Sequence, residues 1–459
     1  MSFNRRDFLQ ISSLIIASSV AQVSGAFEGD SLGSGALAIM QGATDDKSTY
    51  IQVLNDMEEK LTVRARAANG SNLSVSQVDQ FKIPGQDEKL CTFYISGMKP
   101  ETDYFFEVLD RNGSRIDYRV FTALNISKKT CRLGVVSCMN AHFLAPALFD
   151  KATPWQMIQR QKPDMVFLIG DSVYVDYPFV GSQGTEELLA QRHLHARNNT
   201  YLFRLERLIP IVAVWDDHDY GCNNQDKTYA LAAHSQLLFS KFFSTKYNNI
   251  HKKGLGVGSV LDIFNQRFIF MDDRRFRDPQ GTTNARYWGD QQTEWMLQQV
   301  SSAKKPTWLI NGNQFFGGYL GKESYEGNYN ADFANTIMKL SKLSTPIAFV
   351  SGDVHFSELM RIESAILGYT TYEITSSRLY SSMAMSRNID KNPRRLVDGR
   401  PCVSKNNNFV ILDVDVSQGW KIKAKSHLRR YGAQIVAKEM VINPAKTDGS
   451  ELISYGSFC

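Results

Sequence analysis

Four short clusters of residues that can bind metal ions each follow an apolar run. The clusters are Ser137-Cys138, Gly170-Asp171-Ser-Val-Tyr174, Trp215-Asp-Asp-His-Asp219 and Ser351-Gly-Asp-Val-His355. The runs before them, at 133–136, 165–169, 211–214 and 347–350, have the composition of buried strands. Because ligands in open α/β sheets bind at the carboxyl ends of the strands, we expect the four clusters to converge in one crevice. Carboxylates, imidazole and thiol in one place predict a metal-dependent hydrolase.

Carboxylates dominate these clusters, and each has an expected task. Asp171 directly follows a strand and a glycine, which makes it the candidate for the carboxylate that bridges two metal ions. Asp353 and His355 would reach the same ions from a parallel strand. The run 216–218 places two carboxylates and an imidazole after a buried strand, and burying them without a cation would be costly. The alternative for this run is an exposed acidic loop.

Two further residues bear on which metal is bound. Cys138 is either a buried structural thiol or a thiolate ligand, and a thiolate favours iron or another soft transition metal over magnesium. Tyr174 is either a core residue or a phenolate ligand, and a phenolate would again point to ferric iron. Spacing alone does not decide between these alternatives.

The elements that must position these side chains fall into two parts. Residues 27–125 contain strand-like runs, such as 48–53 and 89–95, separated by Gly, Asn, Asp and Pro, which predicts a small all-β domain. In residues 130–459 apolar strands alternate with helical stretches, which predicts a layered α/β domain. One of these helices is expected to begin with Asp290 at its N-cap.

The first 26 residues are typical of an export signal. Arg5-Arg6 precedes an apolar run at 11–20 and small residues near Ala26, which predicts a twin-arginine signal peptide over residues 1–26. An ordinary secretory signal that contains two arginines is the alternative. The apolar run is shorter than the roughly 20 residues that span a bilayer, so no stable membrane anchor is expected. We therefore expect a periplasmic or extracellular protein, with the twin-arginine export machinery as a partner.

Composition limits the class of protein and its partners. Of 459 residues, 43% are hydrophobic and 22% are charged, as in globular proteins with a large core. This length predicts more than one domain. The net charge of +5 is small and no basic block is interleaved with aromatics, so nucleic acid is not expected as a partner. Six cysteines without a CxxC pair fit an exported protein with few or no disulfides.

The order of the motifs resembles that of one known family. This is the alkaline phosphatase D (PhoD-like) family of the calcineurin-like metallophosphoesterase superfamily, and the resemblance covers residues 27 to about 430. It rests on the four clusters and on Asn223-Asn224, Met271–Arg277, Trp288–Leu297 and Trp308–Gln314. The segment Gly97–Val108, with a Pro-x-Thr-x-Tyr turn, likewise resembles a fibronectin type III domain.

The resemblance implies a fold and a set of metal ligands. The fold would be a β-sandwich flanked by helices, preceded by the fibronectin III-like domain. The cofactors would be ferric iron and calcium, with other divalent metals left open. The implied iron-side ligands are Cys138, Asp171, Tyr174, Asp353 and His355. Asp171 would bridge to calcium, and Asp217 and Asn313 would lie on the calcium side.

The same resemblance implies two catalytic residues. His218 would stand near the leaving oxygen as proton donor or charge stabiliser. Arg275 would hold the substrate phosphate, because a guanidinium offers two parallel donors. A surface ion pair of Arg275 with Asp272 or Asp273 is the alternative. The expected reaction is hydrolysis of phosphomonoesters or phosphodiesters by in-line attack of a metal-bound hydroxide.

The sequence departs from the family pattern at two places. The family often carries an acidic residue directly after the Tyr174 position, whereas this chain has Val175 and then Asp176. Related metallophosphoesterases carry a histidine near Asn313-Gln314, where this chain has amides. These differences bear on the second metal and on how the substrate is oriented.

Two other functions are open from the sequence. A phospholipase D-like phosphodiesterase would need a wide apolar mouth, which Tyr177-Pro-Phe179 and Phe315-Phe316 would line if they are not core residues. A non-catalytic binding protein with a degenerate phosphatase domain is the second alternative. The substrate class therefore includes small-molecule, lipid and polymeric phosphate esters.

Overall fold

The computed structural model describes most of the chain beyond the predicted signal peptide. The described residues are 35–56, 58, 60–141, 152–177, 184–244, 256–317, 323–381, 396–397, 400–401, 403–404, 407–429, 435–442 and 452–454. They belong to one compact unit, Ser34–Cys459. Residues 1–26 lie outside the described residues, as do Cys402 and Cys459. No helix in the described part of the chain is both long and apolar enough to cross a bilayer.

Residues 39–122 form two antiparallel sheets that share one core. The first has the order β1-β2-β5-β4, with bounds Ile39–Thr44, Ser48–Asp56, Glu88–Ser96 and Ser74–Lys82. The second has the order β3-β6-β7, with bounds Thr62–Ala67, Asp103–Leu109 and Arg115–Thr122. Ile51 and Val53 of the first sheet and Phe106 and Phe121 of the second are buried in the same cluster. The sheets therefore pack face to face, as alternating strands with one apolar face require.

This part is joined to the rest of the chain by buried polar contacts. The guanidinium of Arg119, on β7, donates to the carbonyl oxygen of Leu205 at 2.6 Å. It also pairs with Asp117 at 2.6 Å, and both side chains are fully buried. A buried ion pair of this kind is costly unless its remaining donors are satisfied, and the carbonyl groups supply those acceptors.

Residues 130–454 build two larger sheets of seven strands each. The first has the order β10-β9-β8-β20-β21-β22-β23, with bounds Ile211–Val214, Met165–Ile169, Thr130–Val136, Asn408–Asp415, Lys421–Arg429, Ile435–Ile442 and Leu452–Ser454. The second has the order β11-β12-β13-β14-β16-β15-β19, with bounds Ser259–Ile263, Gln266–Phe270, Thr307–Ile310, Ile347–Ser351, Thr371–Thr375, Ser357–Ile362 and Val403–Ser404. A small ribbon pairs β17, Leu396–Val397, with β18, Arg400–Pro401.

The strands that precede the predicted clusters run parallel to their neighbours. In the first sheet β8, β9 and β10 are parallel. In the second sheet β12, β13, β14 and β16 are parallel. The four predicted strands of the sequence analysis are thus β8, β9, β10 and β14. The mixed α/β class predicted from alternating strands and helices is confirmed.

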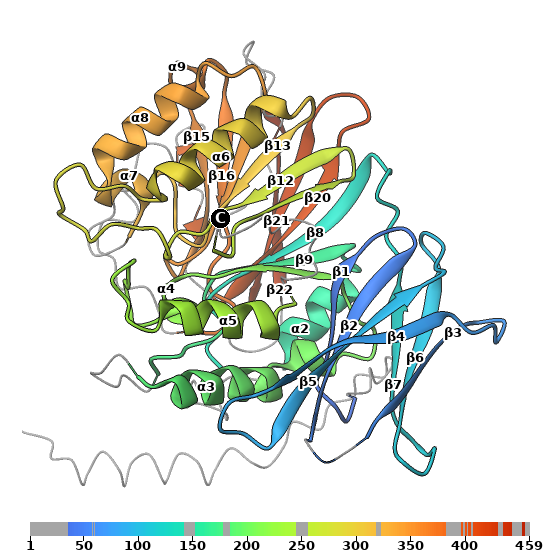
Figure 1. The fold of residues 1–459 in the computed structure, drawn as a ribbon. Helices are drawn as coiled ribbons and strands as arrows, with labels where there is room; N and C mark the ends of the chain where they lie inside the picture. The colour runs from blue at the N-terminus through green and yellow to red at the C-terminus, as the bar shows by residue number, and fades with distance from the viewer. Residues whose placement is uncertain are drawn as a thin grey trace, which may run out of the picture. The chain divides into compact units, whose positions relative to one another are not determined.

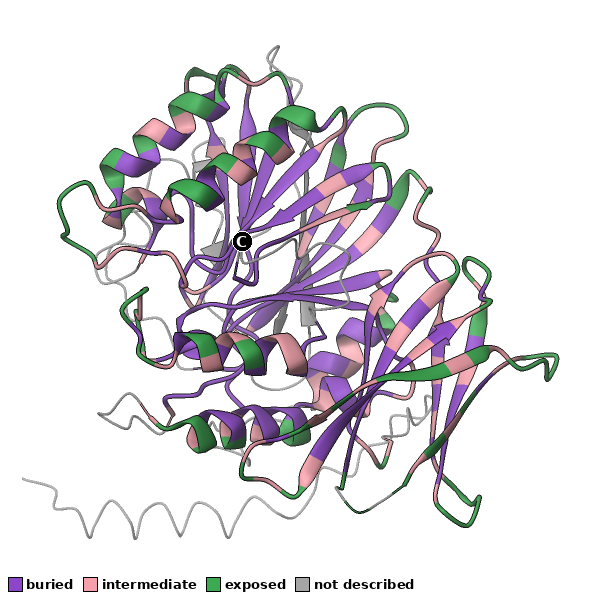
Figure 2. Cartoon of the chain, in the orientation of Figure 1, coloured by how far each residue is buried: buried purple, intermediate pink, exposed green. Residues whose placement is uncertain are grey.

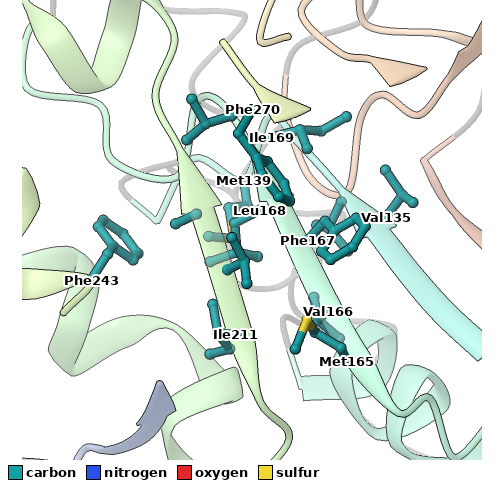
Figure 3. Packing of buried hydrophobic residues seen from close by; sticks show 14 of the residues in the cluster. Val135, Met139, Met165, Val166, Phe167, Leu168, Ile169, Ile211, Phe243 and Phe270 are labelled. Carbon is teal, nitrogen blue, oxygen red and sulfur yellow. The ribbon is translucent and has the colours of Figure 1, made fainter. Parts of the chain in front are cut away.

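The two seven-stranded sheets pack against each other through large apolar side chains. Phe167 of β9 makes an edge-to-face contact with Phe270 of β12, with ring centroids 5.1 Å apart (Figure 3). Along β12, Phe268 and Phe270 belong to this shared core, whereas Ile269 between them belongs to the cluster on the opposite face. Central strands buried on both faces therefore read as continuous apolar runs rather than as alternating ones.

Helices cover the outer face of each large sheet, so that the elements form four layers (Figure 1). The first sheet is covered by α2, α3 and α5, with bounds Ala152–Arg160, Glu186–Asn199 and Ala232–Phe242. The second is covered by α6, α7, α8 and α9, with bounds Gly289–Ser302, Tyr325–Asn328, Asn330–Leu340 and Ser364–Leu367. The central strands β9, β10, β13, β14 and β16 are buried along their whole length, as Figure 2 shows. The described residues also form the short helices η1 (Tyr201–Arg204) and α4 (Asp217–Tyr220).

One predicted helix start is wrong by two positions. Trp288 occupies the N-cap of α6 without a side-chain cap, and Asp290 lies in the first turn. An acidic residue in the first turn is also favoured, because it interacts with the positive end of the helix dipole. Sequence signals of this kind therefore locate the helix better than they locate its first residue.

Candidate metal centre

The predicted ligands all follow strands of the two large sheets. Cys138 follows β8, Asp171 follows β9, and α4 begins with Asp217 directly after β10. Asn313 follows β13, and Asp353 and His355 follow β14. Ligand atoms lie within 4.8 Å of one another in three groups: Cys138, Asp171 and His355; Asp171, Asp217 and His218; Asp216, Asp217 and Asp353. The structure thus brings the clusters together at the ends of the parallel strands, and Asp171 belongs to two groups.

The backbone at this point is strained. Cys138, Asp171, Asp353 and His355 have φ angles of 52°, 54°, 62° and 61°. This left-handed region is uncommon for residues other than glycine, and its cost is of order 1–3 kcal/mol per residue. Four of the predicted ligands have this strained conformation. Because strained residues cluster where function requires them, this observation favours a functional site.

Two glycines let the ligand loops approach each other. A Cβ atom at Gly312 would lie 2.8 Å from the carbonyl oxygen of Trp215, and one at Gly352 would lie 2.9 Å from that of Ile169. Because backbone atoms cannot yield as a flexible side chain does, only glycine fits at either position. The loop after β13 therefore contacts the loop after β10, and the loop after β14 contacts the end of β9.

The thiol and phenol side of the centre is buried. Cys138 is fully buried, and its Sγ lies 3.4 Å from Oδ2 of Asp171. The Tyr174 hydroxyl donates to the same Oδ2 at 3.3 Å. Burial raises the pKa of Cys138, Asp171 and Tyr174 well above their usual values, with neighbouring negative charges adding to it for the thiol and phenol. A bound cation would offset this, because it stabilises the deprotonated forms.

His218 is held by a carboxylate that the sequence analysis noted only as a departure. Its Nδ1 lies 2.8 Å from Oδ1 of Asp176, and its ring stacks on that of Tyr174 at 4.3 Å. Asp176 also accepts the backbone N–H of Asn223 at 3.1 Å. Burial would lower the pKa of His218, but the surrounding carboxylates, that of Asp217 foremost, raise it well above its usual value. The ring is therefore fixed with Nε2 as the nitrogen not bonded to Asp176.

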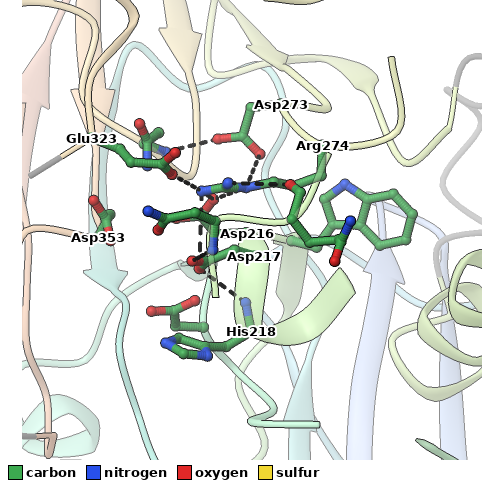
Figure 4. Close-up of polar contacts among 12 residues, drawn as sticks. Asp216, Asp217, His218, Asp273, Arg274, Glu323 and Asp353 are labelled. Atoms are coloured by element: carbon green, nitrogen blue, oxygen red, sulfur yellow. Dashed lines mark hydrogen bonds and ion pairs between the residues drawn. The ribbon is translucent and has the colours of Figure 1, made fainter. Parts of the chain in front are cut away.

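The arginine that contacts the acidic cluster is Arg274 rather than Arg275. Arg274 is fully buried, and its Nε donates to Asp216 at 2.6 Å while its guanidinium pairs with Glu323 at 2.9 Å (Figure 4). It also lies 3.9 Å from Asp217. Arg275 is only partly buried and lines a separate pocket of about 270 Å³. The predicted contact of Arg275 with the substrate phosphate stays a prediction. The positive charge beside Asp217 comes from Arg274.

Several buried polar atoms are left without a hydrogen-bond partner in a way that fits a cation. The buried oxygen atoms Oδ1 of Asp171 and Oδ1 of Asn313 have no partner among the described residues. Buried polar groups are normally satisfied, so such atoms call for a ligand. With the carboxylates, imidazole and thiol of the three groups, the donor set fits metal ions, and its sulfur and phenol donors suit a transition metal on one side.

The two amides that depart from the family pattern have different surroundings. The side chain of Gln314 donates to Oγ1 of Thr375, on β16, at 3.0 Å. Asn313 has its side chain unbonded, and its backbone N–H donates to Oδ2 of Asp273 at 2.9 Å. Gln314 is therefore bonded within the second sheet, and Asn313 is the amide that remains available to a ligand.

A buried carboxylate behind the centre holds two of the ligand loops. Glu373, on β16, accepts the backbone N–H groups of Phe315 and Phe316 at 2.9 and 2.8 Å, and the hydroxyl of Ser351 at 2.6 Å. Phe315 and Phe316 follow Asn313, and Ser351 precedes Asp353. Burial raises the pKa of Glu373 from 4.5 to about 8, although these donors act in the opposite direction.

The raised pKa of Glu373 gives a testable pH dependence of stability. Between pH 5 and pH 8 the folded chain holds a proton on Glu373 that the unfolded chain has lost. This stabilisation is complete below the ordinary pKa and is lost as the pH rises through about 8, by up to about 1.4 kcal/mol per pH unit. The free energy of unfolding, measured with urea, should therefore fall relative to that of Glu373→Gln across this range. A difference that is constant from pH 5 to pH 8 would contradict the assignment.

The hydroxyl-rich loop after β16 was not among the residues predicted from the sequence. Ser377 Oγ lies 3.1 Å from Sγ of Cys138, and Ser381 Oγ lies 3.3 Å from the Tyr174 hydroxyl and 3.2 Å from Nε2 of His355. The signal was present, because these residues follow the apolar strand 371–375 as the other clusters follow theirs. Hydroxyl groups bind metals less distinctively than carboxylates do, and the pattern was therefore not recognised.

The comparisons with known proteins leave the function to be argued from this centre. No protein-family model matches the chain, and no curated protein sequence matches it. Among solved structures, amylomaltase from Corynebacterium glutamicum is similar over 36% of this chain, with 13% identity and a TM-score of 0.16. The chain covers 24% of that protein's length. A similarity this weak supports no statement about fold or activity.

Proposed function

We propose that this chain is a metal-dependent phosphoesterase of the alkaline phosphatase D type. The observation that supports it most is the position of Asp171, whose carboxylate belongs to two adjoining groups of ligand atoms. A carboxylate shared between two ions is what a two-metal phosphoesterase needs, because one ion positions the attacking oxygen and the other stabilises the leaving oxygen. Cys138 belongs to the first group and Tyr174 contacts Asp171, whereas the second group offers carboxylates and an imidazole, so the two groups fit chemically different ions.

The architecture supports the same proposal at the level of domains. Two sheets packed face to face between helices agree with the metallophosphoesterase core that the resemblance implies for residues 130–459. The sandwich within residues 27–125 has the Tyr104 hydroxyl accepting the backbone N–H of Lys99 at 2.7 Å, a contact of the kind seen at the tyrosine corner of immunoglobulin-like domains. This contact supports the fibronectin III-like assignment.

Each side chain of the centre has a task in this proposal. Iron would be held by Cys138, Asp171, Tyr174, Asp353 and His355, and calcium by Asp171, Asp217 and Asn313. When bound, these ions supply Lewis acidity, which neutralises charge on the phosphate and activates water. His218, fixed by Asp176, offers Nε2 as a proton donor to the departing alcohol oxygen. Asp217 keeps a lowered pKa, because His218 and Arg274 outweigh its burial, so it is anionic before any ion binds.

The phospholipase D-like alternative loses the support of Phe315 and Phe316. Phe315 and Phe316 are buried and pack on Phe349 of β14, with ring centroids 5.0 and 5.2 Å away. They are core residues and do not line an apolar mouth. A phospholipase D-like activity therefore rests on Tyr177-Pro-Phe179, of which 178 and 179 lie outside the described residues. The binding-protein alternative does not account for strained, buried carboxylates gathered around one point.

Export and location are part of the proposal as well. The twin-arginine signal over residues 1–26 implies a protein that folds before export, which suits a chain whose metal ligands come from five separate loops. We infer a periplasmic or extracellular location and a small-molecule, lipid or polymeric phosphate ester as substrate. No contact among the described residues identifies which ester this is.

The test is hydrolysis of a p-nitrophenyl phosphate monoester beside the bis-p-nitrophenyl diester, using exported protein supplied with iron and calcium. We expect turnover of at least one ester, and the faster one distinguishes a phosphatase from a phosphodiesterase. Dialysis against a chelator should remove the activity, and the two metals should restore it together. Absence of turnover of both esters, with both metals bound, would contradict the proposal.

A further inference from the structure

The hydroxyl of Ser377 has a hydrogen-bond pattern that directs its proton to the Cys138 sulfur. Ser377 follows β16 and is fully buried. Its Oγ accepts the backbone N–H of His355 at 2.9 Å and lies 3.1 Å from Sγ of Cys138. A serine hydroxyl has one proton to donate, and Sγ is its only acceptor among the described residues. The sulfur therefore receives a hydrogen bond from a residue that is itself oriented by a predicted ligand.

The second hydroxyl beside the sulfur has a shorter hydrogen bond to a different acceptor. The hydroxyl of Ser137 is 3.3 Å from Sγ, but it donates to the carbonyl oxygen of Ser376 at 2.7 Å. Oδ2 of Asp171 and the carbonyl oxygen of Asp353, at 3.4 and 3.5 Å, are acceptors. Acceptors favour the neutral thiol, and a donor favours the thiolate. Ser377 is thus a described side chain whose single hydroxyl proton is directed at the Cys138 sulfur.

We propose that Ser377 is a positioning residue that hydrogen-bonds the Cys138 thiolate and tunes its bond to the metal ion. The inference rests on the proposed function, because it assumes that Cys138 is a ligand. A hydrogen bond to a ligating sulfur draws electron density away from the metal, so it sets the energy of thiolate-to-metal charge transfer and the reduction potential. The hydrogen bond also fixes the orientation of the Cys138 side chain. Loss of a hydrogen-bond partner of a metal ligand typically weakens metal binding about 10–100-fold.

The test uses the full chain loaded with ferric iron alone and compares Ser377→Ala with Ser137→Ala. Both changes remove a hydroxyl beside the same sulfur, but Ser137 donates to the carbonyl oxygen of Ser376 at 2.7 Å, whereas Sγ is the acceptor of the Ser377 hydroxyl. In Ser377→Ala we expect the Cys138-dependent absorption band to move to longer wavelength and iron affinity, from chelator competition, to fall about 10–100-fold. Ser137→Ala should leave the band in place, and Ser377→Thr should restore it. An unmoved band in Ser377→Ala, or an equal shift in both alanine variants, would overturn the inference.

A second measurement keeps the inference testable if Ser377→Ala does not fold. In the unaltered chain, the metal–sulfur stretch seen by resonance Raman spectroscopy should shift on exchange into D2O, and it should do so in Ser137→Ala as well. If Cys138→Ser removes the absorption band but the stretch does not shift in D2O, the inference about Ser377 is wrong and the proposed function still stands. If the unaltered chain binds iron without a band that depends on Cys138, both this inference and the proposed ligand set are wrong.

Discussion

Replacing Asp171 by Asn is expected to lower kcat/KM for the preferred phosphate ester by at least about a thousandfold. The change removes one negative charge from the carboxylate that two groups of ligand atoms share, while keeping its shape. Metal ions supply several kcal/mol of transition-state stabilisation, and each 1.36 kcal/mol is a factor of ten in rate. The variant should also bind both metals more weakly. The measurements are steady-state hydrolysis of the ester and metal content by mass spectrometry.

The control for this variant is Asp415→Asn, which makes the same chemical change at a remote turn. The carboxylate of Asp415, at the end of β20, accepts local hydrogen bonds from the backbone N–H and the hydroxyl of Ser417. The Asp415→Asn variant should therefore have unaltered kcat/KM and unaltered metal content. If Asp171→Asn retained most of the activity with both metals bound, the shared carboxylate would not bridge the ions. Equal losses in the two variants would point to an effect of charge on the fold instead.

Replacing Arg274 by Met is expected to lower the free energy of unfolding by about 3–5 kcal/mol. Arg274 is fully buried between the carboxylates of Asp216 and Glu323, which it pairs with at 2.6 and 2.9 Å (Figure 4). Met fills a similar length but leaves Asp216, which is also fully buried, without its cation. The pKa of Asp216 is already raised well above its usual value by burial. The variant is measured by urea denaturation of the protein without added metal.

Arg275→Met is the matched comparison for this prediction. Arg275 is partly exposed, and its guanidinium adjoins the Tyr220 hydroxyl rather than a buried carboxylate. Its replacement should change the free energy of unfolding by about 0.5 kcal/mol or less, as for most surface substitutions. A large loss in Arg275→Met with a small one in Arg274→Met would reverse the assignment of the two neighbours. Their effects on KM for the ester separately test whether Arg275 contacts the phosphate.

Much of the framework could be predicted because it is encoded locally. The runs at 165–169 and 347–350 are apolar enough to be buried on both faces, so they are strands of packed parallel sheets. A polar cluster that directly follows such a strand lies at the carboxyl end of that strand, because it is next to it in the sequence. Asp171 and Asp353 each lie at the carboxyl end of a parallel strand for this reason, but β9 and β14 belong to different sheets, so the packing of the two sheets brings the two carboxylates together.

The identity of each contact could not be read in the same way. Arg274 and Arg275 are adjacent in an irregular segment, and only the path of that segment decides which guanidinium lies beside Asp216. The pairing of Asp176 with His218 joins residues 42 positions apart. The sequence pattern around these residues does not show which side chains will pair, because side-chain direction in a loop is set by long-range packing.

The sequence by itself determined which residues gather at the ends of the parallel strands, and hence that a metal-binding chemistry is available to this chain. The tertiary structure decided how close they come and which neighbours hold them. Contacts such as that of Gly312 with the carbonyl oxygen of Trp215 bring separate loops within backbone distance. The hydroxyl of Ser377 reaches Cys138 across 239 positions of sequence. A strand is encoded by the apolar residues of its own short segment, whereas distances between loops depend on how whole sheets pack.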